Sequence, residues 1–409
     1  MSGEATTASA SVVVGRRPGA WLDLARRIPG SWRSLLAVYL VSRAFSTTLL
    51  LVVYEVATVT GATFITPGSD RSFLDFTVSW DSDRYRTIAL HGYPTTLPTD
   101  SAGQVLPNEW AFLPVFPTLC HLLMVATGMD FSIASVLIAT AAGAGAVLVL
   151  YRLLEPRVGH RSALWAVLLF CFGPLSFVLS VGYAESLSLF LLFGGVLALQ
   201  RRQYHLVLLA GVVAAFTRPG ALALALALAI HLVVRWRTER ASLDRRELVR
   251  IVVAGLVVAA AGLAWPVVAH LATGEPDAYL QTEMAWWVDY VGRPDFVPLT
   301  PWFLLAGRWL GVSGIALVVL IVGLAAWWLS RPSTARLGHE AHGFVVSFAL
   351  YLLAVFLPQQ SLFRLLMPLS PLLGSRAVGE RPWLRRSLLG TSLVLQPVAA
   401  VLLWLYVAP

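Results

Sequence analysis

The sequence predicts an all-α polytopic membrane protein with about eleven membrane-spanning helices. Three observations lead to this fold class. The 409 residues are 57% hydrophobic and only 13% charged, and the mean hydropathy is +0.74. Long apolar runs recur from residue 35 to residue 405, and short basic loops separate them. A soluble protein cannot bury that much apolar surface, so a large soluble domain is excluded.

The net charge of +8 comes from arginines that cluster at the ends of apolar runs. Such clusters are the topology signals of membrane proteins, and we therefore expect no nucleic-acid partner. The two cysteines, Cys120 and Cys171, lie in apolar surroundings. We expect them to be small buried side chains, and not part of a disulfide framework.

A spanning helix needs about 20 predominantly apolar residues. By this measure the chain divides into a polar cytoplasmic tail at 1–32 and a single transmembrane domain at 33–409. The tail lacks the apolar core and cleavage site of a signal peptide. The candidate spans lie at roughly 33–56, 131–153, 161–181, 184–200, 204–217, 219–234, 250–270, 301–329, 343–357, 363–378 and 386–408.

Six arginine clusters predict the topology. They lie at residues 16–33, 152–161, 201–202, 235–250, 331–336 and 376–386. By the positive-inside rule all six belong on the cytoplasmic side of the plasma membrane. The apolar segment 111–127 is then a helix in the outer interface, because a crossing there would place the cluster at 152–161 outside. The segment 204–236 crosses twice and turns outside at 217–220, where proline and glycine interrupt the helix.

This topology leaves the N-terminus inside, the C-terminus outside, and two long outer loops at 57–130 and 271–300. Both outer loops are acidic and rich in aromatic residues, whereas the cytoplasmic loops are short and basic. The first begins its polar part with W-D-S-D-R-Y at 80–85. Carboxylates beside tryptophan at the edge of a bilayer suit a site that binds sugar. We therefore expect any chemistry on the outer face.

Asp81 is the central residue of the first outer loop. It precedes a short predicted helix at 82–91, and as an N-cap it would bind free backbone amides. Equally, its carboxylate can act as a general base that removes a proton from an acceptor hydroxyl. Asp83 points elsewhere on such a helix and is expected to face solvent. Arg84 lies one turn from Asp81 and can pair with it or with a phosphate.

Other charged residues sit at expected outer helix ends. Glu109 either binds sugar hydroxyls or favours the N-terminal end of the next helix, and for Glu185 helix capping is the default. Arg218 and Arg364 lie on the side where arginine is disfavoured, which suits the phosphate of a membrane-anchored substrate. The alternatives are a salt bridge to Glu185 or Asp81, or snorkelling to the interface. We favour phosphate binding for Arg218 more than for Arg364.

Two arginines, Arg43 and Arg308, fall inside apolar spans, where they mark function or pack against a loop carboxylate. The cluster W-W-V-D-Y at 286–290 can stack on a sugar or anchor at the interface, and we favour the interfacial aromatic belt.

Histidines give little support for a metal site. Four of them are scattered along the chain: His91, His121, His231 and His270. His339 and His342 are close in sequence but fall in a loop expected on the cytoplasmic side. We expect no metal and no cofactor, and the sequence has no Gly-rich phosphate loop for a nucleotide.

Five blocks occur in the order found in one known family. They are W-D-x-x-R-Y-x-x-I-A-x-x-G-Y (80–93), N-E-W-A-F-L-P-V-F-P (108–117), G-P-L-S-F-V-L-S-V-G-Y-A-E-S-L-S-L-F (173–190), A-A-F-T-R-P-G-A-L (214–222) and Q-Q-S-L-F-R-L-L-M-P (359–368). From about residue 43 to 371 the chain resembles the PIG-V family, whose eukaryotic members are the second mannosyltransferase of GPI-anchor synthesis. The all-arginine basic set and compact loops are typical of a bacterial, actinobacterial-type member.

The resemblance implies a GT-C-like glycosyltransferase fold, with juxtamembrane helices in the first outer loop. It also implies polyprenyl-phosphate-mannose as the donor, an inverting reaction, an α-1,6 linkage, and Asp81 as the general base. The substrate-binding residues that it implies are Trp80, Arg84, Tyr85, Glu109, Tyr183, Glu185, Arg218, Ser361 and Arg364.

The acceptor is open, because bacteria of this type make no GPI anchors. The candidates are a lipid-anchored mannan or phosphatidylinositol mannoside, another envelope glycolipid, and a secreted protein. Two other classes of protein remain as alternatives: a lipid or glycan flippase, and a non-catalytic partner of a glycosyltransferase complex. Transporters often contain repeated halves, and we see no clear internal repeat in this sequence.

Overall fold

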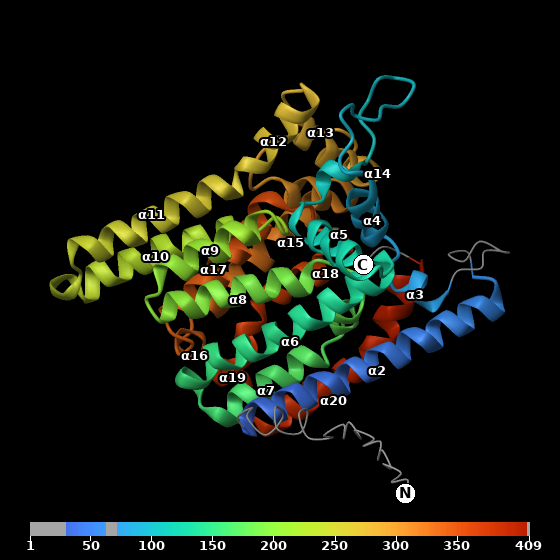
Figure 1. Ribbon diagram of the computed structural model, residues 1–409. Coiled ribbons are helices and arrows are strands. Elements are labelled where there is room, and N and C mark those ends of the chain that lie inside the picture. Colours follow the sequence, from blue (N-terminus) through green and yellow to red (C-terminus); the bar gives the residue numbers. More distant parts are fainter. Residues whose placement is uncertain (1–29, 63–71, 407–409) are drawn as a thin grey trace, which may run out of the picture.

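The computed structural model describes residues 30–62 and 72–406, which fold almost wholly into helices (Figure 1). Most of the predicted tail at 1–32 lies outside the described residues. Within these described residues, five helical stretches are long and apolar enough to cross a membrane: Trp32–Thr60, Phe131–Val158, Arg245–Thr273, Pro301–Leu329 and Pro382–Tyr406. The expectation of an all-α, multi-pass membrane protein is confirmed.

Most helices follow the predicted spans, but the predicted span 161–181 is not one continuous helix: its α-helix ends at Cys171 and a 3₁₀ helix follows over Ser176–Ser180. The first half of the chain contains α2 (Gly30–Thr60), α3 (Phe73–Phe76), α4 (Asp81–His91), α5 (Val115–Thr127), α6 (Phe131–Val158), α7 (His160–Cys171), α8 (Glu185–Gln200) and α9 (Tyr204–Ala215). The second half contains α10 (Leu222–Thr238), α11 (Arg245–Gly262), α12 (Ala264–Thr273), α13 (Ala278–Ala285), α14 (Val288–Val291), α15 (Pro301–Leu329), α16 (Pro332–Ala335), α17 (His339–Val355), α18 (Leu362–Leu365), α19 (Arg376–Gly379) and α20 (Pro382–Ala400).

The segment predicted as a span at 363–378 is not a continuous α-helix. It consists of the four-residue α18 and a 3₁₀ helix over Met367–Gly374. Pro368 and Pro371 lie in this stretch and cannot donate a backbone hydrogen bond, so a regular α-helix is not sustained. The total of eleven crossings therefore stays a prediction.

The lengths and ends of the helices agree with two other expectations, one for the segment 111–127 and one for the segment 204–236. The segment expected in the interface contains α5, whose 13 residues span about 20 Å, well short of a bilayer core of about 30 Å. The segment 204–236 does break into two helices, α9 and α10, with the interruption at the predicted proline and glycine. The sides of the membrane on which these features lie stay predictions.

The helices pack side by side in one bundle (Figure 1). Helix α6 packs along α8, α8 packs on α9, and α10 contacts both α11 and α17. Helix α2 lies beside α20 along one edge of the bundle. Arg43 on α2 is buried and donates to the carbonyl oxygens of Cys171 (2.8 Å) and Ser176 and to Ser180 Oγ (2.9 Å). It thus binds the end of α7, and not the loop carboxylate that we considered.

The loops expected on the cytoplasmic side gather at one end of the bundle. Three ion pairs join them: Arg157–Glu340 at 3.2 Å, Arg202–Glu239 at 2.7 Å and Arg336–Glu380 at 3.7 Å. The acidic and aromatic helices α4, α13 and α14 lie at the opposite end (Figure 1). Basic and acidic loops alternate in the sequence, and in the structure they lie at opposite ends of the bundle.

Candidate functional site

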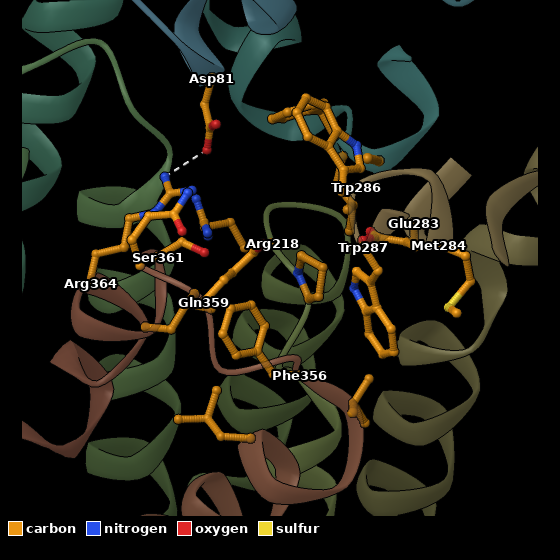
Figure 2. Close-up of a pocket in the computed structure, with 18 of the residues that line it drawn as sticks. Asp81, Arg218, Glu283, Met284, Trp286, Trp287, Phe356, Gln359, Ser361 and Arg364 are labelled. Carbon is orange, nitrogen blue, oxygen red and sulfur yellow. Dashed lines mark ion pairs between the residues drawn. The ribbon is translucent and has the colours of Figure 1, made fainter. Parts of the chain in front are cut away.

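A cavity of about 540 Å³ opens among the acidic and aromatic helices (Figure 2). Its walls come from both predicted outer loops, from the turn before α10, and from the end of α17 with the segment that follows it. Asp81, Arg218 and Arg364 form a polar end, while Trp287 and Phe356 belong to an apolar side (Figure 2). The volume falls in the range of about 300–1,000 Å³ that small-molecule sites occupy.

Asp81 is the first residue of α4 and is not its N-cap. The cap residue is Trp80, whose backbone has φ 60° and ψ −119°, and no side-chain cap hydrogen bond is made. Such a conformation is rare for a residue with a side chain. The Trp80 indole donates to the backbone oxygen of Trp404 at 2.8 Å, which helps to hold the turn. The cap interpretation of Asp81 is therefore wrong.

A second segment packs against this turn. Gly182 donates to the Thr77 oxygen at 3.1 Å, and Ser82 Oγ donates to the Gly182 oxygen at 2.6 Å. The Asp81 amide donates to the Tyr183 hydroxyl at 3.3 Å. A Cβ at Gly182 would lie 2.5 Å from Ser135 Oγ, so only glycine allows this close approach. The contact fixes Asp81 relative to the start of α8.

Two carboxylates and two arginines form one ion-pair network at the polar end. Arg364 Nη1 lies 2.6 Å from Asp81 Oδ2 and 2.8 Å from Glu185 Oε1. Arg218 Nη1 lies 2.7 Å from the same Glu185 oxygen. The Tyr183 ring supports the Arg364 guanidinium at 5.1 Å. The charges of these four ionic groups sum to zero, which makes burial of the network tolerable.

Six of the ten predicted site residues line the cavity: Trp80, Asp81, Tyr85, Arg218, Ser361 and Arg364. Tyr183 and Glu185 are buried next to the arginines. Arg84 and Glu109 are not in the cavity wall and pair with each other at 2.8 Å, so Arg84 does not pair with Asp81. Asp83 is exposed, as expected from its position on the helix.

The aromatic cluster at 286–290 contributes Trp286, Trp287, Asp289 and Tyr290 to the cavity wall. This placement favours contact with a ligand over the interfacial belt that we expected. Arg308 on α15 is exposed.

Glu283 on α13 lines the same cavity and was not singled out from the sequence. Burial raises the pKa of its carboxyl to about 7, even though the Tyr279 hydroxyl and Arg218 oppose that shift. The sequence does contain a signal for Glu283. Tyr279, Glu283 and Trp286 are spaced to share one face of α13 and its extension. The cavity wall thus contains three carboxyl groups, those of Asp81, Glu283 and Asp289.

We expect the Glu283→Gln variant to change the pH dependence of stability. In the folded protein the carboxyl ionises near pH 7, but in the unfolded chain it ionises near pH 4.5. Between these values the folded state binds more protons, so the stability of the wild type falls as pH rises. The loss is at most about 3 kcal/mol. The thermal midpoint in detergent should therefore fall less between pH 5 and 8 in Glu283→Gln than in the wild type. An identical fall in both proteins would contradict the prediction.

The histidines are less scattered than the sequence indicated. His231 on α10 and His339 at the start of α17 are in contact, with Nδ1 and Nε2 2.9 Å apart. His342 lies one turn further along α17 and contacts the Leu329 oxygen instead. The expectation of isolated histidines was wrong for this pair, because 108 residues separate them in sequence.

Comparison with known families agrees with the sequence blocks. The family profile described as Mannosyltransferase (PIG-V) matches residues 31–272. The match covers more than half of the chain and includes the first four blocks, while Glu283, Ser361 and Arg364 lie beyond it. No curated protein matches the chain. The chain belongs to the PIG-V family of mannosyltransferases and is a multi-pass membrane mannosyltransferase.

Proposed function

We propose that the protein transfers mannose from polyprenyl-phosphate-mannose to a lipid-linked acceptor, an envelope glycolipid or lipid-anchored glycan, on the extracytoplasmic face of the plasma membrane. The observation that carries this proposal is the form of the cavity: a carboxylate and two arginines at one end, and mostly apolar and aromatic side chains on the rest of its wall, where Glu283 and Asp289 add two further carboxyl groups. A sugar phosphate on a prenyl chain has this same division into a charged head and an apolar tail.

The arginines bind the donor phosphate in this scheme. Arg218 and Arg364 are planar donors that suit phosphate oxygens, and each already contacts a carboxylate oxygen at 2.6–2.8 Å. A phosphate entering the cavity competes with Asp81 for Arg364. The Asp81 carboxylate is then available to an acceptor hydroxyl. The prenyl chain extends along the apolar wall near Phe356 and Trp287.

The chemical step is an inverting displacement in a GT-C-like fold. The acceptor oxygen attacks the anomeric carbon, the bond from that carbon to the phosphate oxygen breaks, and its electron pair stays on the phosphate. The acceptor proton passes to Asp81. An α-linkage, expected to be α-1,6, results from a β-linked donor. The negative charge lost at Asp81 reappears on the leaving phosphate, so the charge facing Arg364 is constant throughout the step.

The proposal is tested by reconstituting the purified protein in liposomes with radiolabelled polyprenyl-phosphate-mannose and an envelope lipid extract. We expect label in a heavier glycolipid, identified by mass spectrometry, and no transfer from a nucleotide-activated mannose in a parallel reaction. A flippase would move the labelled lipid across the bilayer without changing its mass. A non-catalytic subunit would show neither activity.

A further inference from the structure

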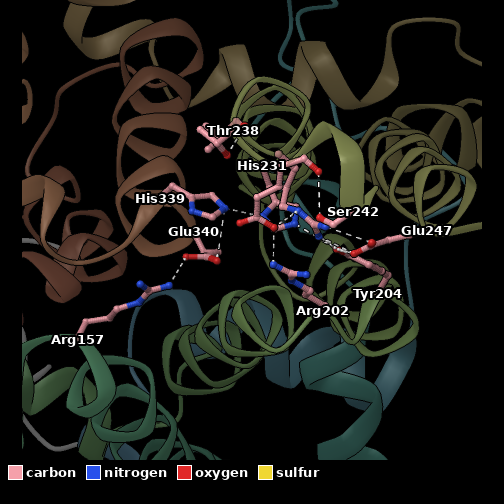
Figure 3. Close-up of polar contacts among 12 residues, drawn as sticks. Arg157, Arg202, Tyr204, His231, Thr238, Ser242, Glu247, His339 and Glu340 are labelled. Carbon is pink, nitrogen blue, oxygen red and sulfur yellow. Dashed lines mark hydrogen bonds and ion pairs between the residues drawn. The ribbon is translucent and has the colours of Figure 1, made fainter. Parts of the chain in front are cut away.

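A second group of ligating side chains, drawn in Figure 3, lies at the start of α17, whose other end lines the cavity. Among the residues that the structure describes, His231, His339 and Glu340 each offer one ligand atom, and these atoms lie within 4.8 Å of one another. His339 Nε2 is 2.9 Å from His231 Nδ1 and 3.4 Å from Glu340 Oε1. His231 and Glu340 are only 1% and 5% exposed. The mannosyl-transfer mechanism uses none of the three.

The hydrogen bonds around His231 favour the tautomer that binds a metal. The Tyr204 hydroxyl donates to Glu247 Oε1 at 2.7 Å, so its oxygen accepts from His231 Nε2 at 3.2 Å. The proton of the neutral imidazole is therefore on Nε2, and the lone pair of Nδ1 points toward His339. Metal-binding histidines usually have such a partner on the second ring nitrogen, and the partner here leads on to a carboxylate.

The positive and negative side chains around the cluster are equal in number. The two carboxylate oxygens of Glu340 have different partners. Oε2 accepts a hydrogen bond from Arg157 at 3.2 Å, while Oε1 faces His339 (Figure 3). Three arginines and three glutamates form ion pairs there: Arg157–Glu340, Arg202–Glu239 and Arg235–Glu247, and Arg235 also contacts Glu239 at 3.0 Å. A dication between the histidines would thus meet guanidinium groups that are paired, and it would share the Glu340 carboxylate with Arg157.

We propose that His231, His339 and Glu340 bind one divalent transition-metal ion, and that this ion is zinc. Two imidazoles and a carboxylate are a donor set typical of zinc, with water as the fourth ligand. Metal–ligand bonds of about 2.0–2.1 Å in a tetrahedron separate neighbouring ligand atoms by about 3.3 Å. The separations of 2.9 and 3.4 Å are close to that value. Binding replaces the proton shared by the two rings, so His339 moves its own proton to Nδ1.

The ion would join two helices that both lead to the cavity. Helix α10 begins shortly after Arg218, and α17 ends in residues that line the cavity wall. His231 lies within α10 and His339 is the first residue of α17. A metal bridge between them fixes the two helices relative to each other at the end far from the chemistry.

The test uses the full chain with a tag that contains no histidine, purified in detergent and stripped with a chelator. After Zn²⁺ addition and removal of free metal, we expect one zinc per chain by elemental analysis and a higher thermal midpoint. Co²⁺ in its place should give the visible absorption of a tetrahedral ion. His339→Gln should weaken zinc binding at least tenfold and abolish the rise in midpoint.

His342→Gln is the matched control, because it removes a histidine of the same helix that lies outside the cluster. This variant should bind zinc like the wild type. Glu340→Gln keeps the shape of the side chain and provides a second test if His339→Gln fails to fold. The proposal is overturned if the wild type retains no zinc, or if His339→Gln and Glu340→Gln bind zinc as tightly as His342→Gln. Either result would leave only a hydrogen bond between two histidines.

Discussion

The Asp81→Asn variant should lose mannosyl transfer by about 10²- to 10⁴-fold in kcat, the usual contribution of a general base. The amide keeps the shape of the side chain and can still accept a hydrogen bond from Arg364, but it cannot accept the acceptor proton. The substitution also removes one negative charge from a network that is otherwise neutral. The donor phosphate should therefore bind at least as tightly, so KM for the donor should be unchanged or lower.

This division between kcat and KM distinguishes a base from a residue that only supports the fold. Asp83→Asn is the matched control, because Asp83 lies two residues further along α4 and is exposed. Its kcat should stay within about twofold of the wild type, since exposed substitutions rarely disturb a structure. If Asp81→Asn instead retains near-normal transfer, Asp81 is not the base. Glu283 would then be the next carboxyl group to test, because it lines the same cavity.

Much of the candidate site was predictable because its residues carry local signals. Asp81 stands in a polar stretch between apolar runs, and Arg218 lies beside the proline and glycine that separate α9 from α10. The hydrophobic pattern likewise placed the helices, since a chain in a bilayer must form backbone hydrogen bonds within each segment. Such features depend on neighbours in the sequence, and the sequence shows them directly.

The contacts that depend on tertiary packing were not predictable. Arg84 pairs with Glu109 rather than with Asp81, because α4 turns this side chain toward the 3₁₀ helix that contains Glu109. His231 and His339 meet only because α10 packs on α17. Glu283 becomes a cavity residue because α13 folds back over the first outer loop. Nothing in the local sequence specifies which distant segment covers each of these residues.

The Glu185→Gln variant should be the most damaging substitution for stability in the site. One oxygen of Glu185 accepts from both Arg218 and Arg364, and the side chain is only 4% exposed. Glutamine keeps the volume and removes the charge, so the largely buried Arg218 loses its carboxylate partner and Arg364 keeps Asp81 as its ion-pair partner. Removing one partner of a buried ion pair typically lowers the free energy of unfolding by about 3–5 kcal/mol. The thermal midpoint in detergent should fall by several degrees, and transfer should be lost because the two arginines proposed to bind the donor phosphate lose the carboxylate that positions them.

Glu109→Gln is the control that separates the effect of burial from the loss of any glutamate. Glu109 also pairs with one arginine at 2.8 Å, but the Arg84 side chain is 37% exposed, so solvent screens the pair. Such pairs contribute about 0–1 kcal/mol, and the midpoint should hardly change. The double variant Glu185→Gln with Arg218→Gln should recover part of the lost stability, because it removes one of the two guanidinium groups left without Glu185. If Glu185→Gln is no less stable than Glu109→Gln, the network does not hold the polar end of the cavity together.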